Sequence, residues 1–180
     1  MHDLVSRAIE KFLTEQSVSL EDRAGTLPPG QLLHDAARNL DKPVDELAED
    51  LGAWLVQQEE IWRLLRFCGR DFLDFLLRLE ELPDRIRLIT DDVDIPEIGL
   101  SRGDDGLLWV TFTNGSPIWT SLLAGLLRAM ADDYGTLCVI FRQDGGLCID
   151  VSDLAFAAAR MDRSNQSGNP DSRSSGTGRT

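Results

Sequence analysis

Histidine and cysteine are scarce in this sequence of 180 residues. The two histidines are His2 and His34, and the three cysteines are Cys68, Cys138 and Cys148. So few donors favour neither a metal centre nor general-base catalysis, and an enzyme is the function with the least support. Scattered cysteines of odd number indicate free thiols in a reducing compartment. We therefore expect a cytoplasmic protein that is not an enzyme.

Basic side chains are also in short supply. Eighteen Lys and Arg stand against thirty-one Asp and Glu, which leaves a formal net charge of −13. Nucleic acids and anionic membranes are polyanions that attract Lys and Arg, so neither is expected as a partner. The sequence has no apolar run long enough to cross a bilayer. Charged residues throughout Met1–Gln16 argue against a signal peptide.

Familiar chemical motifs are missing as well. The sequence contains no glycine-rich phosphate loop, no paired-cysteine metal spacing and no Ser/His/Asp order. The acidic run at residues 91–94 is a candidate cation site. A solvated loop is the preferred interpretation, because nothing next to it completes the six to eight oxygens that calcium takes.

The first half of the chain carries helical patterns. Apolar side chains recur at three-to-four spacing in five stretches, and each stretch predicts an amphipathic helix. These stretches are Leu4–Leu13, Leu32–Leu40, Val44–Leu55, Ile61–Phe67 and Phe72–Leu79. Pro43 opens the third helix, and we expect Pro83 to start a new helical turn, since proline is favoured at the first helical position.

After residue 90 the pattern shifts toward a period of two. Strands are predicted at Ile95–Ser101 and Leu107–Thr113, a long helix at Ile118–Met130, and strands at Thr136–Arg142 and Leu147–Ser152. The predicted fold class is α+β, with an N-terminal helical subdomain followed by a strand-strand-helix-strand-strand antiparallel sheet.

The domain prediction is one folded unit and a tail. Residues 1–161 form a single domain, with its helical part at 1–90 and its sheet part at 91–152. Residues 162–180 are rich in Ser and Gly and contain no aliphatic side chain. Such a segment cannot bury enough apolar surface to offset its ordering entropy, so a disordered tail is expected.

Several segments resemble one known family. The start MHDLVSRAIEKFL, the run LDKPVDELAEDLG at Leu40–Gly52, and FCGRDFLDFLLRLEELPDRI at Phe67–Ile86 follow its helical pattern. The later GLLWVTFTNGSPIWTSLLAGLLRAM fits its sheet and long helix. The chain resembles the heme nitric oxide/oxygen-binding (H-NOX) family, which is related to the sensory domain of soluble guanylate cyclase. The resemblance covers about residues 1–152 and implies an H-NOX-like fold.

The resemblance also implies a heme site, and this sequence departs from it. The family's iron-binding histidine is matched here by Pro83, which has no lone pair to offer iron. The family's tyrosine-serine-arginine motif, which holds the heme propionates, is matched by Val110, Phe112 and Asn114. These side chains cannot replace the charge-assisted hydrogen bonds of that motif.

Other matched positions are apolar. Pro96 keeps the place of a proline that presses on the heme in the family, and Val5 and Leu55 match pocket-lining positions. Cys68 and His34 are the candidate substitute iron ligands. For Cys68 a small buried hydrophobe is the preferred interpretation, and for His34 a histidine at the boundary of the core.

Loss of heme would leave a pocket on the order of 500 Å³. Empty, such a cavity would cost roughly 10 kcal/mol, which is comparable with the stability of a whole domain. The pocket must therefore collapse, fill with side chains or hold another ligand. Seven bulky aromatics are candidate fillers, and the alternative is an aromatic box for a new ligand: Trp54, Trp62, Phe67, Phe72, Trp109, Phe112 and Trp119.

Two functions follow as expectations. The first is an H-NOX-like regulatory domain that is not an enzyme, has no cofactor and acts through protein interaction. By resemblance, its partner is a histidine kinase, a cyclase or a chemotaxis receptor. The alternative is a heme-based NO or O2 sensor in which Cys68 or His34 serves as the iron ligand.

Overall fold

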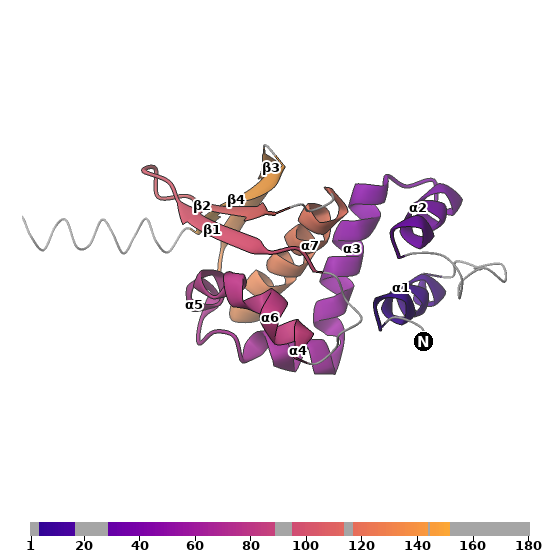
Figure 1. The fold of residues 1–180 in the computed structure, drawn as a ribbon, viewed down its shortest axis with the longest axis horizontal. Coiled ribbons are helices and arrows are strands. Elements are labelled where there is room, and N and C mark those ends of the chain that lie inside the picture. The colour runs from indigo at the N-terminus through magenta and orange to yellow at the C-terminus, as the bar shows by residue number, and fades with distance from the viewer. Residues whose placement is uncertain (1–3, 17–28, 89–94, 114–116, 144, 152–180) are drawn as a thin grey trace, which may run out of the picture.

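The computed structural model describes residues 4–16, 29–88, 95–113, 117–143 and 145–151 (Figure 1). The α-helices are α1 (Leu4–Glu15), α2 (Pro29–Asn39), α3 (Val44–Gln57), α4 (Glu59–Arg66), α5 (Phe72–Leu77), α6 (Leu82–Arg87) and α7 (Pro117–Tyr134). A single 3-10 turn, η1 (Leu79–Glu81), joins α5 to α6. The strands are β1 (Ile98–Arg102), β2 (Leu108–Phe112), β3 (Cys138–Gln143) and β4 (Gly146–Val151).

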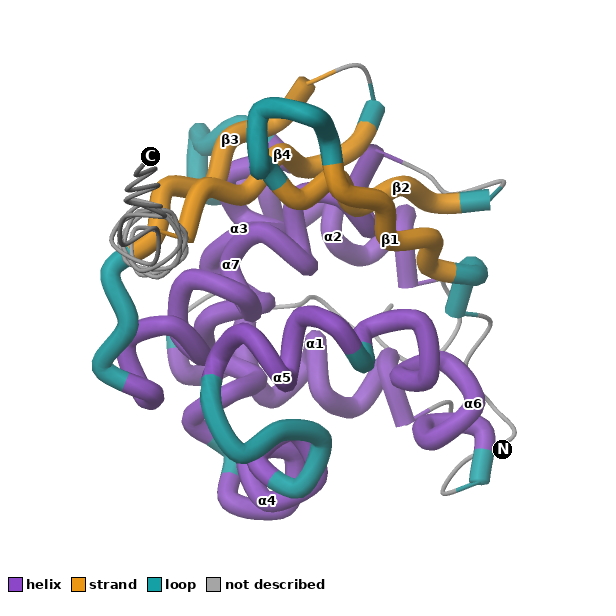
Figure 2. The backbone as a smooth tube through the Cα atoms, turned by 90° about the vertical axis from the view of Figure 1, so that its left-hand side faces the viewer, coloured by secondary structure: helices purple, strands orange, loops and turns teal. Residues whose placement is uncertain are grey.

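The four strands form one antiparallel sheet in the order β1-β2-β4-β3. Strand alternation places Val110, Leu147 and Ile149 on one face, where they are fully buried. Helix α7 packs against this face, which we call the inner face, and Figure 2 shows the sheet lying above the helices. The predicted α+β class and its strand-strand-helix-strand-strand order are confirmed.

Some predicted boundaries were wrong. The first strand begins at Ile98 rather than Ile95, because Pro96 has no N–H and the Arg87 side chain bonds the carbonyl of Ile95 at 3.0 Å. The third strand begins at Cys138, since the N–H of Thr136 still caps α7 through a 2.8 Å bond to a carbonyl of that helix.

The larger of two hydrophobic cores lies between the sheet and the helices. It joins the inner face to α7 and to residues of α4, α5, η1 and α6. Phe72, Phe75 and Tyr134 form a ring cluster within it, with centroids 6.2 Å apart. The Asp71 side chain caps α5 by accepting a 2.8 Å bond from the N–H of Asp74, which fixes where this helix begins.

The smaller core joins α1, α2 and the first part of α3. Phe12 and Trp54 meet there with ring centroids 5.6 Å apart, and the indole N–H of Trp54 donates to Glu15. Figure 1 shows α1 and α2 on one side of α3, and the sheet with α7 on the other. Helix α3 therefore belongs to both halves of the molecule.

Glycines let α3 and α7 pack with their backbones in contact. A Cβ added to Gly52 would lie 1.9 Å from the carbonyl oxygen of Leu122, and one added to Gly125 would lie 1.8 Å from that of Glu49. No other residue type fits at either position without moving a helix axis.

The acidic run at 91–94 and the predicted tail at 162–180 lie outside the described residues. Within the described part of the chain, no helix is both long and apolar enough to cross a membrane.

Candidate functional site

Pro83, the position matched to the family's iron ligand, is buried at the start of α6. It occupies the first turn, where its fixed φ suits the helix and its missing N–H leaves no bond unmade. The predicted new helical turn at Pro83 is confirmed. The neighbouring Leu82 belongs to the larger core. The side chains of Leu82 and Pro83 therefore present only apolar atoms to the protein interior.

The positions matched to the propionate motif lie on β2. Val110 is fully buried on the inner face, and Phe112 packs against the same core while partly exposed. Asn114 lies outside the described residues. Neither described side chain carries a donor that could bind a carboxylate.

The remaining matched positions are Leu55, Pro96 and Val5. Leu55 is partly buried and packs against the smaller core, apart from Val110 and Phe112, which lie in the larger one. Pro96 is partly buried just before β1. The side chain of Val5 lies outside the described set.

Cys68 and His34 lie in different surroundings. Cys68, between α4 and α5, is 2% exposed, and its thiol donates to the carbonyl of Leu64 at 3.3 Å. Burial raises the pKa of the Cys68 thiol, which keeps it protonated and a poor iron ligand. His34 is exposed on α2, so the expected boundary position was wrong. No group of three or more His, Cys, Asp and Glu suited to a metal occurs among the residues described.

The aromatic residues expected to fill a pocket do not act together. Trp54 and Phe72 are buried, but in different cores. Phe67 is 85% exposed, and Trp62 also reaches the surface, so both were wrongly assigned to an interior role. Trp62 lies on α4 and Phe67 follows it. Helix α4 is strongly amphipathic and turns only one narrow side inward, where Leu65 is its buried residue.

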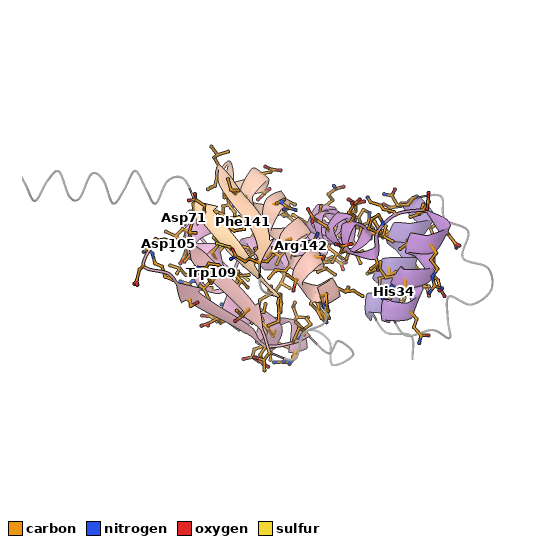
Figure 3. The ribbon with its side chains drawn as sticks, turned by 90° about the horizontal axis from the view of Figure 1, so that it is seen from above. His34, Asp71, Asp105, Trp109, Phe141 and Arg142 are labelled. Atoms are coloured by element: carbon orange, nitrogen blue, oxygen red, sulfur yellow. The ribbon has the colours of Figure 1, made fainter. Side chains whose placement is uncertain are left out.

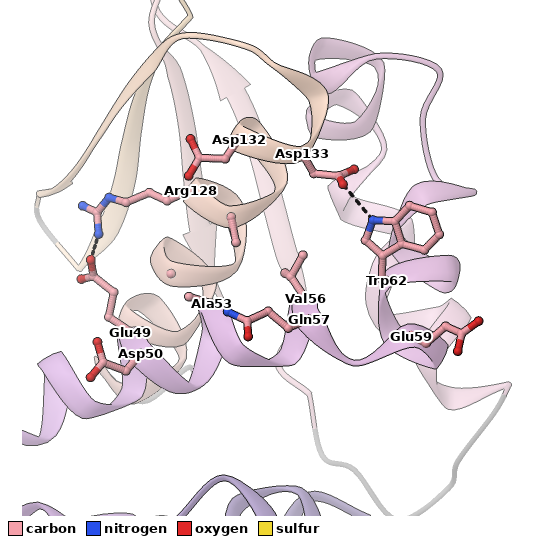
Figure 4. A pocket seen from close by; sticks show the side chains of 12 residues that line it. Glu49, Asp50, Ala53, Val56, Gln57, Glu59, Trp62, Arg128, Asp132 and Asp133 are labelled. Atoms are coloured by element: carbon pink, nitrogen blue, oxygen red, sulfur yellow. Dashed lines mark hydrogen bonds and ion pairs between the residues drawn. The ribbon is translucent and has the colours of Figure 1, made fainter. Parts of the chain in front are cut away.

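A groove that the sequence did not predict runs between α3 and α7. It has a volume of about 720 Å³ and is open to solvent (Figure 4). Its lining is mostly acidic and small: Glu49, Asp50, Ala53, Val56, Gln57, Glu59, Trp62, Gly125, Arg128, Ala129, Asp132 and Asp133. None of the positions matched to the family heme site lines it.

Most charges of this groove are already paired. Glu49 contacts Arg128, and the indole N–H of Trp62 donates to Asp133 at 3.0 Å (Figure 4). Asp50 and Glu59 pair with Lys42 and Arg63, which lie outside the lining, and Arg66 reaches Asp133 at 3.5 Å. The pairs neutralise the acidic lining locally, so the groove is not a strong cation site. Of these contacts, Glu49–Arg128 joins α3 to α7, and Trp62–Asp133 joins α4 to α7.

The sequence matches a known protein family over more than half of its length. That family, described as Haem-NO-binding, matches residues 29–140. Among curated proteins, none matches the chain significantly.

Solved structures with a similar fold include H-NOX proteins. One from S. oneidensis in the Fe(II)NO ligation state is 13% identical and has a TM-score of 0.66, over 84% of this chain and 99% of its own. A single-site mutant from T. tengcongensis is 15% identical, with a TM-score of 0.60 over 84% and 98% of the two chains. An unliganded Fe(II) mutant from K. algicida is 19% identical, with a TM-score of 0.60 over 83% and 89%.

Proposed function

The chain belongs to the haem-NO-binding (H-NOX) family, and we propose that it is a regulatory member that works without heme held in the family's usual way. In this proposal the domain is not an enzyme, lies in the cytoplasm and acts by contacting another protein. The observation that carries the proposal is Pro83, buried at the place matched to the iron ligand.

The donor set around this place does not fit heme. Iron in a heme protein takes an axial His, Cys, Met or Tyr, and proline supplies none of these donors. Val110 and Phe112 are apolar at the positions that would hold the propionates. The matched positions thus offer no donor to the metal, and two of the three that would hold the carboxylates are apolar.

The buried apolar surroundings support a pocket that is closed or reduced. Leu82, Val110 and Met130 belong to one continuous core of buried side chains. Filling the space in this way avoids the cavity cost of roughly 10 kcal/mol that an empty heme pocket would carry. A pocket that takes another apolar molecule is the second form of the same proposal.

The second candidate function is a gas sensor with a substitute iron ligand. Cys68 is the better candidate because it is buried in the larger core, whereas His34 is exposed on α2 beside the smaller one. Coordination by Cys68 would require loss of a proton from a thiol whose pKa is raised by burial. This requirement favours the heme-free function.

The partner that we propose is a signalling protein, such as a histidine kinase, a cyclase or a chemotaxis receptor. The net charge of −13 favours a partner with a basic contact face, since opposite charges steer association.

Hemin titration tests the proposal. The full chain, Pro83→His, Cys68→Ala and His34→Ala are purified and titrated with hemin, and the Soret region is recorded. We expect no stoichiometric Soret band from the unchanged chain, and a band that appears only in Pro83→His would show that the pocket is open and lacks only the iron ligand. A stoichiometric band in the unchanged chain that disappears in Cys68→Ala or His34→Ala would show heme held by a substitute ligand, as the gas-sensor alternative requires.

Native mass spectrometry separates the two heme-free forms. The protein is isolated from cells without added ligand and its intact mass is recorded under non-denaturing conditions. A retained small molecule identifies a repurposed pocket, whereas the bare chain mass identifies a closed core.

A further inference from the structure

The face of the sheet opposite α7, which we call the outer face, carries a row of apolar side chains. Trp109 on β2 pairs with Cys148 on β4, and Cys148 pairs with Phe141 on β3. Directly paired residues point to the same side of a sheet, so the three side chains form one continuous row. Figure 3 looks down on the molecule from above and labels Trp109 and Phe141, whose strands β2 and β3 lie on either side of β4.

Strand β3 extends this row along its own direction. Leu137, Val139 and Phe141 alternate with inward residues and are 75%, 56% and 40% exposed. In the same area Cys148 is fully buried although the helices that contact the sheet pack on its inner face. Its partners across the two ladders on this face are the larger side chains of Trp109 and Phe141. Among the described residues, the outer face therefore carries an apolar row that is exposed along β3 and bordered by polar residues such as Thr111 and Asp150.

This exposure has no role in the fold itself. The inner residue Ile140 is buried in the larger core, whereas Val139 and Phe141 contribute nothing to that core. Clustered exposed apolar residues of this kind mark protein contact sites more often than isolated ones do. The adjoining edge of β3 is partly blocked, because Arg128 donates to the carbonyl of Ile140 at 2.8 Å. The face of the sheet is thus better suited to contact than its edge.

Negative charge surrounds the row. Asp150 pairs with Val139 across the β3–β4 ladder and is exposed. Asp105 lies in the turn before β2, close enough for its charge to act on the Cys148 thiol. Neither carboxylate forms an ion pair with another described residue, in contrast to those of the α3–α7 groove.

We propose that the outer face, centred on Trp109, Val139 and Phe141, docks an apolar segment flanked by Lys or Arg from a signalling partner. The apolar row would bury the middle of the segment, and Asp150 and Asp105 would contact its basic flanks. A second copy of this chain fits poorly, since two acidic rims would face each other on molecules of net charge −13. The inference rests on the proposed regulatory function and names the surface that carries it.

The test uses the full isotope-labelled chain and a synthetic peptide, Lys-Lys-Leu-Thr-Phe-Thr-Val-Lys-Lys. Two matched peptides replace either its three apolar residues by Ser or its four Lys by Glu. We expect the first peptide to shift the backbone amide signals of β2 and β3, and the other two to bind at least about tenfold more weakly. Amide shifts confined to α3 and α7, or equal binding of all three peptides, would overturn the proposal.

Variants of exposed residues locate the contact. Val139→Ser with Phe141→Ser should weaken binding about tenfold or more, and Asp150→Asn about threefold. Leu77→Ser on α5 and Glu60→Gln on α4 are the matched controls, because they remove an exposed apolar group and an exposed carboxylate elsewhere. Leu137 lies just before β3. Weakened peptide binding in Leu137→Ser is a further test, and it does not depend on the strand tolerating two changes. Equal losses in the controls would contradict the assigned surface.

Two other occupants would appear in the same experiment. Concentration-dependent dimerisation that Phe141→Ser abolishes would assign the face to a second copy. A shift of the β3 amides in Phe156→Ser without peptide would assign it to the chain's own C-terminal segment. Either result would overturn docking of a partner. The hemin titration remains a separate readout, so a heme-binding result would reject the proposed function without deciding which surface binds the peptide.

Discussion

The two hydrophobic cores differ in how far along the chain their members lie from one another. The buried side chains of the smaller core come from α1, α2 and α3, all within residues 4–57, and Ile118 and Leu122 of α7 pack against them. The larger core joins Val56 to residues as distant as Val151, and it includes inner-face residues of all four strands. Local cores assemble from near neighbours and open at lower cost, while cores of distant elements set the global stability. The difference predicts that α1 and α2 can unfold while the sheet stays intact.

The largest expected effect comes from Gly125, where the two halves meet. In Gly125→Val the new side chain would overlap the carbonyl of Glu49, so α3 and α7 would have to separate and both cores would open. We expect a loss of at least about 4 kcal/mol in the free energy of unfolding, measured by urea titration. Gly30→Ala is the control, because an added Cβ there meets nothing within 4 Å. Near-normal stability of Gly125→Val would show that the cores do not depend on this contact.

A matched pair of core substitutions separates the two regions. Phe12 and Phe75 are each 1% exposed, one in each core. Replacing either by Ala should cost about 3–5 kcal/mol locally. Hydrogen exchange should show that Phe75→Ala lowers protection in the sheet and α7, whereas Phe12→Ala lowers it only in α1 and α2. Uniform loss of protection in both variants would mean that the molecule unfolds as one unit.

The smallest expected effect on stability comes from a side-chain link between β3, α3 and α7. Arg142 on β3 donates to Asp45 at the start of α3 at 2.8 Å, and to Ser121 on α7 at 2.7 Å. Arg142→Gln should cost up to about 1 kcal/mol at neutral pH, because the ion pair is partly exposed. Urea titration at several pH values measures this difference.

The pH dependence of that difference identifies the ion pair. The hydrogen bond from Arg142 lowers the pKa of Asp45 in the folded protein. The stabilisation from the Arg142–Asp45 pair is therefore complete above the pKa of Asp45 in the unfolded chain, which is near 4. It is lost as the pH falls through the lower pKa of Asp45 in the folded protein. The advantage of the unchanged chain over Arg142→Gln should shrink below about pH 4. Arg38→Gln, which breaks a pair within α2 alone, is the control. A difference that does not change with pH would assign the effect to the Ser121 bond.

Sequence patterns predicted the element order because period and turn residues are local properties. The stripes of α1, α3 and α7 each appear in the structure as helices with a buried side. Strand ends were less accurate, since the carbonyl of Ile95 accepts a bond from the Arg87 side chain and the N–H of Thr136 bonds back to the end of α7. The burial of Phe67 and Trp62 was wrong because α4 turns only part of its surface toward the core.

The proline at position 83 is a fact of the sequence, and so is the excess of acidic residues. Pro83 could be matched to the iron-ligand position from a contiguous motif, and its lack of a donor follows from covalent structure alone. Which apolar residues lie outside was decided only by the tertiary structure. Val139 and Ile140 are neighbours in sequence and similar in chemistry, yet α7 covers the inner face and leaves the outer one open. Hydrophobicity determined that these strands would form, and packing between distant elements determined which face each side chain would meet.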